Sequence, residues 1–70
     1  MFIIVIRPPA AQAPPSWPER FYFAQGPHGG FTPHRDAAAE FNNRDTAEFA
    51  AQQINLNYAT WHATVEPAEN

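Results

Sequence analysis

Residues 30–54 read GFTPHRDAAAEFNNRDTAEFAAQQI, and this stretch decides most of the fold. Within it, Asn43 predicts the N-cap of a helix, because its side chain can accept hydrogen bonds from the amides of the following turn. Asp45 then stands in the first turn, where the helix dipole favours an acidic residue. We therefore expect a helix over residues 44–56, preceded by one short helical turn over residues 36–40.

The expected helix has two apolar sides. At about 100° per residue, one stripe consists mainly of small side chains that allow close packing on a sheet: Ala47, Ala50, Ala51 and Ile54. Phe49 and Leu56 fall on nearly the opposite side. Either they flank a wider buried arc or lie under the proline-rich segment with Trp17, or they form a contact patch for another protein or a second copy of the chain. At the C-terminal end of the helix, Asn55 or Asn57 is expected near a residue in the left-handed conformation, where the chain leaves the helix.

Four stretches have the composition of strands. The apolar, mostly β-branched run at 2–6 (FIIVI) predicts a strand buried on both faces. Its second face therefore needs a cover, either the proline-rich segment or a partner. Residues 20–25 (RFYFAQ) predict a second strand, with the two phenylalanines on one face and Tyr22 on the other. Residues 31–32 predict a short third strand after a glycine-rich turn, and the alternation over residues 60–66 predicts a half-buried last strand.

The chain is short enough to form one domain, residues 1–70. It has no cysteine, so no disulfide stabilises it, and a reducing compartment is expected. Residues 8–18 contain five of the eight prolines and predict a polyproline-like surface connector, with Trp17 folded back onto the core. Residues 67–70 are expected to be a frayed tail. The predicted class is α+β: a small antiparallel sheet of three to four strands with one helix across a face, in the order β-β-(β)-α-β.

Composition also narrows the partners and the compartment. The net charge is −3, there is no lysine, and the four arginines are scattered, whereas nucleic-acid binders usually show a basic stripe. Direct nucleic-acid binding is therefore not expected. The apolar run at 2–6 is too short for a signal peptide or a membrane span. We expect a cytoplasmic protein without membrane contact.

No group of residues has the spacing of a known catalytic, cofactor or metal site. His28 and His34 with Asp36 match no familiar metal-ligand pattern, and His62 stands alone, so solvated histidines are the expectation. Ser16, the only serine, has no elbow motif around it, and Glu40, Asp45 and Glu48 are expected to be a solvated group at the helix end. Residues 26–30 join two strands and lack a following lysine, so a hairpin turn is expected rather than a phosphate site. The PxxP match at residues 15–18 lies inside the folded domain, so a structural connector is expected. We expect no enzyme, no cofactor and no metal.

Residues 20–65 resemble small hypothetical proteins of bacteriophages and prophages. Those proteins combine an apolar first strand, an aromatic strand, G-x-[FY]-T, an Ala-x-x-Phe step and a capped helix with Arg-Glu-Glu-Ala. The matching residues here are Gly30, Phe31 and Thr32; Ala38 and Phe41; and Arg44, Asp45 and Ala47. The chain departs from the pattern at Thr46 and in its proline-rich insertion. The resemblance implies a phage-encoded accessory protein in the host cytoplasm, of the kind that includes anti-CRISPR and other host-takeover inhibitors.

The sequence thus predicts a non-enzymatic protein-binding module. Its leading form is a phage-type inhibitor of a bacterial host protein, such as a CRISPR effector. Large aromatic and apolar anchors dominate binding hot spots, so the expected contact residues are Trp17, Tyr22, Phe49, Leu56 and Trp61. The alternative is a self-associating structural or accessory phage protein that uses the same patch to form a homodimer.

Overall fold

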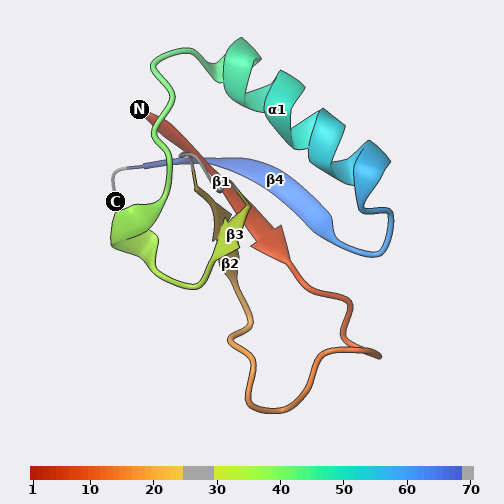
Figure 1. Ribbon diagram of the computed structural model, residues 1–70. Helices are drawn as coiled ribbons and strands as arrows, with labels where there is room; N and C mark the ends of the chain where they lie inside the picture. The colour runs from red at the N-terminus through yellow and green to blue at the C-terminus, as the bar shows by residue number, and fades with distance from the viewer. Residues whose placement is uncertain (25–29, 69–70) are drawn as a thin grey trace.

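The computed structural model describes residues 1–24 and 30–68. A four-stranded antiparallel sheet in the order β3-β2-β1-β4 carries one α-helix across one face (Figure 1). The elements are β1 (Phe2–Arg7), β2 (Phe21–Phe23), β3 (Phe31–Thr32), the 3-10 turn η1 (Arg35–Ala37), α1 (Arg44–Asn57) and β4 (His62–Pro67). The predicted α+β class and the order of elements are confirmed. Within the described ranges, no helix is both long and apolar enough to cross a membrane.

β1 is the central strand and organises the core. It pairs along its whole length with β4, from Phe2↔Pro67 to Arg7↔His62, and only near its end with β2. Its alternate residues point to opposite faces. Ile4 and Ile6 are fully buried under α1. Ile3 and Val5 lie on the other face, where their burial has a different origin.

Residues beyond η1 extend the sheet where β2 stops short. Phe41 and Phe2 exchange two backbone hydrogen bonds, with both N···O distances at 2.8 Å. The Ala39 amide donates to the Phe23 carbonyl at 2.9 Å. The expected helical turn over residues 36–40 is therefore shorter than predicted and covers only Arg35–Ala37. The chain leaves it in an extended conformation because these sheet hydrogen bonds hold it.

α1 begins and packs as predicted, but it ends differently. The Asn43 side chain accepts a hydrogen bond from the Asp45 amide at 2.7 Å, and the buried residues are Ala47, Ala51 and Ile54. The prediction of a left-handed exit at Asn55 or Asn57 is wrong. Both residues belong to the helix, and the cap is Tyr58 with φ −130°, whose amide donates to the Ile54 carbonyl.

Asn55 instead completes the outer edge of the sheet. Its amide nitrogen donates to the Ala63 carbonyl at 3.1 Å, and its Oδ1 accepts from the Ala63 amide at 2.8 Å. The side chain thus offers β4 the donor and acceptor that a neighbouring strand would offer. Because Ala63 is buried, this pair of hydrogen bonds fixes the helix against the sheet edge.

The proline-rich segment and the stretch predicted as a tail both differ from the prediction. The proline-rich segment forms turns rather than a polyproline helix. The Pro9 carbonyl accepts hydrogen bonds from the amides of Gln12 and Ala13, and the Pro14 carbonyl accepts one from the amide of Trp17. The last strand runs through Pro67, and the Ala68 amide donates to the Met1 carbonyl at 2.8 Å. The ordered sheet therefore extends into the stretch predicted as a tail, of which residues 69–70 lie outside the described residues.

Candidate functional site

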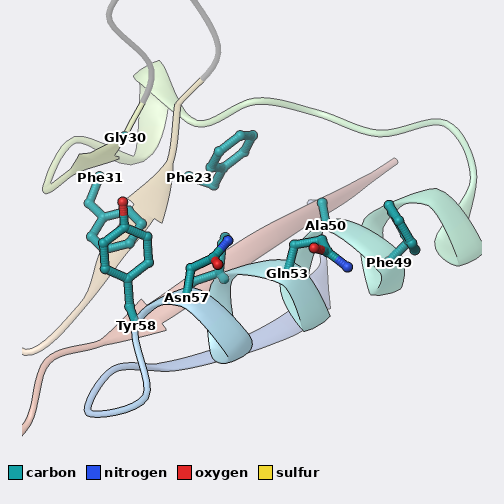
Figure 2. Close-up of a pocket in the computed structure, with 9 residues that line it drawn as sticks. Phe23, Gly30, Phe31, Phe49, Ala50, Gln53, Asn57 and Tyr58 are labelled. Atoms are coloured by element: carbon teal, nitrogen blue, oxygen red, sulfur yellow. The ribbon is translucent and has the colours of Figure 1, made fainter.

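A groove runs beside α1, because the helix covers only half of the sheet. α1 packs on β4 and β1, while the same face of β2 and β3 carries Phe23 and Phe31 beside it. The resulting hollow encloses about 410 Å³ (Figure 2). Its lining residues are Phe23, Gly30, Phe31, Phe49, Ala50, Gln53, Ile54, Asn57 and Tyr58.

The groove is aromatic at both ends. Phe31 and Tyr58 stand together at one end, with ring centroids 5.2 Å apart, and Phe49 stands at the other (Figure 2). Phe49 is 63% exposed and Tyr58 is 52% exposed, so both rings offer apolar surface to a ligand. The carboxamides of Gln53 and Asn57 lie on the helical wall between them and can donate or accept hydrogen bonds. Such a surface suits apolar side chains flanked by polar backbone.

A cluster of five aromatic rings extends from the Tyr58 end of the groove toward the proline-rich segment. Its members are Tyr58, Phe31, Trp61, Phe21 and Trp17. Trp61 is its centre, with ring centroids 5.4 Å from Phe21, 5.1 Å from Phe31 and 5.9 Å from Trp17. Trp17 also meets Phe21 edge-on at 5.8 Å. As predicted, Trp17 folds back onto the core, and this contact fastens the proline-rich segment to the sheet.

The structure separates the five predicted contact residues into different places. Trp17 and Trp61 lie together in the aromatic cluster, and only Phe49 lines the groove. Leu56 is 69% exposed on α1 but lies outside the groove. Tyr22 is on the opposite face of the sheet, because it pairs with Val5 rather than with a residue under the helix.

Sequence reasoning did not identify most of the groove. Phe23, Phe31 and Tyr58 were not among the expected contact residues, and neither were Gln53 and Asn57. The alternation of β2 does place Phe23 on the helix side, and its cross-strand partner Phe31 shares that side. The pattern does not contain the lateral position of α1, and this position leaves the two rings uncovered by the helix.

The titratable residues form no comparable site in the described part of the chain. Within residues 1–24 and 30–68, no three His, Cys, Asp or Glu side chains gather closely enough to hold a metal ion. His34 and His62 are exposed. His28, which was weighed with His34 and Asp36 as a metal site, lies outside the described residues, and so do residues 26–29 of the glycine-rich turn. The groove beside α1 is the candidate functional site.

Comparison with protein-family models, with curated proteins and with solved structures found no match for this chain. The resemblance to small phage proteins accordingly remains a prediction from sequence.

Proposed function

We propose that this chain is a non-enzymatic protein-binding domain whose groove beside α1 receives apolar side chains of another protein. The observation that carries the proposal is the groove itself: about 410 Å³ of mostly apolar hollow with Phe49 and Tyr58 exposed at its two ends. Burying a phenylalanine that was exposed contributes on the order of 1.5–3 kcal/mol. Two such rings beside a preformed hollow supply the anchors that hot spots require.

The two edges of the sheet offer much less to a partner. A peptide that adds a strand needs a row of free backbone donors and acceptors. At the β4 edge, the Asn55 side chain already occupies the amide and the carbonyl of Ala63, and Pro67 has no amide to donate. At the other edge, β3 is only two residues long. Recognition through side chains in the groove is therefore favoured over strand addition.

The inhibitor expected from the sequence is one form of this proposal. A phage-encoded inhibitor of a bacterial host protein, such as a CRISPR effector, would act by covering a surface of its target with this groove. That narrower identity rests on the residues that resemble small phage proteins, namely the G-x-[FY]-T step and the capped helix. The groove supports binding in general and does not distinguish among targets.

Self-association is the second candidate, and one observation favours it. Phe49 and Leu56 are seven residues apart on the outward side of α1, and each is more than half exposed. Two copies could bury these side chains by packing their helices together. In that case Leu56 would contribute to dimer formation as much as Phe49. Of these two residues, binding through the groove requires only Phe49.

Paired substitutions on α1 test the proposal. We expect wild type and Leu56→Asp to capture the same protein from bacterial lysate, and Phe49→Asp to lose it while keeping its melting temperature. Retention of that protein by Phe49→Asp would refute binding through the groove. Light scattering after size-exclusion chromatography measures the molar mass and so tests self-association. A wild-type dimer that Leu56→Asp converts to a monomer would establish it.

A further inference from the structure

In the part of the chain that the structure describes, the sheet face opposite α1 buries apolar residues without an α-helix above them. Ile3 is 3% exposed and Val5 is 1% exposed at its centre. Around them lies a small hollow of about 130 Å³, bounded by long polar side chains and Pro67. The sequence predicted that this face needs a cover. Arginine, tyrosine and glutamate side chains supply it, and their stems shield the two apolar residues.

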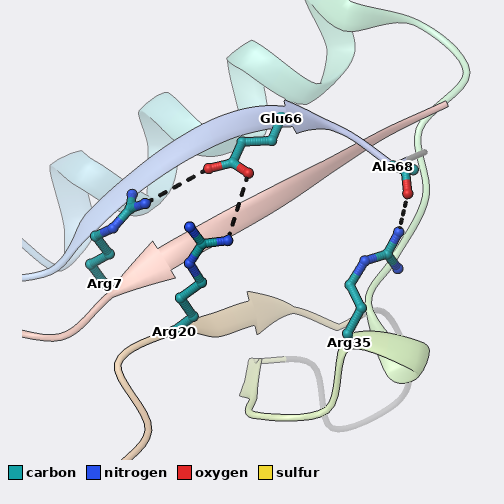
Figure 3. Close-up of polar contacts among 5 residues, drawn as sticks. All are labelled: Arg7, Arg20, Arg35, Glu66 and Ala68. Carbon is teal, nitrogen blue, oxygen red and sulfur yellow. Dashed lines mark hydrogen bonds and ion pairs between the residues drawn. The ribbon is translucent and has the colours of Figure 1, made fainter. Parts of the chain in front are cut away.

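Arginines that are far apart in the sequence meet on this face. Arg7 ends β1, Arg20 directly precedes β2, and Arg35 begins η1. Arg7 Nη2 lies 3.8 Å from one carboxylate oxygen of Glu66, and Arg20 Nη1 lies 4.0 Å from the other. Arg35 Nη2 donates to the carbonyl of Ala68 (Figure 3).

These contacts leave the face with a surplus of positive charge. Three of the four arginines are here, and Glu66 is the single acidic residue among the described side chains of this group. The local charge is therefore +2 on a chain whose net charge is −3. Each guanidinium has five N–H donors, and the distances to Glu66 exceed the 2.7–2.9 Å or so of a tight charged hydrogen bond. Within residues 1–24 and 30–68, most of these donors make no hydrogen bond.

We infer that the hollow between Arg20 and Arg35 binds a carboxylate, supplied by an acidic side chain in a peptide segment of another protein. The hollow is bordered by both arginines, Tyr22 and Glu66. The two guanidinium groups outweigh the single carboxylate in charge, and together with the phenol they can donate to one bound anion. The hollow has about the volume of four water molecules, which suits a carboxylate and its adjoining methylene. Ile3 and Val5 form an apolar floor, which strengthens charged contacts made above it.

The charge distribution favours an acidic peptide over a nucleic acid. Arg20 and Arg35 border one small hollow, whereas phosphate backbones are followed by an extended basic stripe. The remainder of the chain is acidic and would repel a long polyanion. This site lies on the opposite side of the sheet from the groove, so it does not depend on the proposed function.

A peptide titration followed by two-dimensional ¹H–¹⁵N NMR tests the site. The probe is acetylated, amidated tetra-glutamate, and the control peptide is tetra-glutamine with the same ends. We expect tetra-glutamate to shift the amide signals of Ile3, Val5 and Tyr22, and tetra-glutamine to leave them in place. Salt at about 1 M, where the Debye length is about 3 Å, should abolish the shifts.

Two matched variants locate the charge that matters. Arg20 is half exposed, so Arg20→Gln should keep the fold and weaken tetra-glutamate binding about tenfold or more. Arg44→Gln removes the same charge from α1, where Arg44 pairs with Glu48, and should change affinity by less than about twofold. Equal effects of the two variants, absence of tetra-glutamate binding, or tighter binding of single-stranded oligothymidine at these residues would each overturn the inference.

Discussion

Replacing Asn55 by alanine should destabilise the domain far more than an ordinary substitution on a helix surface. The change removes both hydrogen bonds between the Asn55 side chain and Ala63, at 3.1 and 2.8 Å. Because Ala63 is only 4% exposed, water has poor access to the amide and carbonyl that are left behind. A buried backbone group without a partner costs about 1–3 kcal/mol.

The expected loss of unfolding free energy is about 2 kcal/mol. At the lower end of that range, two unpaired groups cost roughly 2–3 kcal/mol together, and the higher helix propensity of alanine returns about 0.5 kcal/mol. For a domain of this size, 2 kcal/mol lowers Tm by about 8–16 °C. Urea unfolding followed by circular dichroism measures the free energy, and hydrogen exchange of the Ala63 amide reports whether the edge of the sheet has opened.

Gln52→Ala is the matched control, because it also truncates a carboxamide to a methyl group on the same helix. Gln52 is exposed, so this variant should stay within about 0.5 kcal/mol of wild type. If Asn55→Ala and Gln52→Ala unfold at the same urea concentration, and the Ala63 amide exchanges at an unchanged rate, the structural role given to Asn55 is refuted.

Two further predictions concern packing and buried polar groups. Thr64→Val should stabilise the domain by about 1 kcal/mol in urea unfolding, because the Thr64 hydroxyl is buried without a partner in the described structure; Thr32→Val, which loses an acceptor for the His34 amide, should instead be neutral or destabilising. Ala51→Leu should cost about 1–3 kcal/mol, because Ala51 lies in the core where α1 meets the sheet. Ala50→Leu, directed at the groove, should cost less, and equal losses would contradict the close helix–sheet contact.

The parts of the fold that depend on local chemistry could be predicted from the sequence. Asn43 caps α1 because its side chain needs only the amides of the next turn, which lie beside it in the sequence. The small stripe of α1 and the apolar run of β1 indicated which faces meet, since periodicity fixes side-chain direction within each element. The exposure of Phe49 and Leu56 also followed from periodicity, although the sequence left open whether another segment covers them.

The parts that depend on how elements lie relative to one another could not be predicted. Asn55 suggested a helix end, as asparagine often does, because its real partner Ala63 is set by the packing of α1 beside β4. The groove exists because α1 is displaced toward β4. This displacement is a tertiary feature, and no periodicity in the sequence predicts it. The arginine face was partly accessible: Arg7 has the same parity in β1 as Val5, but Arg20 and Arg35 join it only through the strand order.

Site-specific photo-crosslinking on α1 measures directly whether the groove is the binding surface. A benzophenone amino acid at Gln53 would stand in the groove wall, whereas the same group at Gln52 would stand one residue away, on the exposed surface outside the groove. After irradiation in bacterial cells, we predict a covalent adduct with another protein from position 53 and little or none from position 52. Equal adducts from both positions, or an adduct from position 52 alone, would contradict binding through the groove.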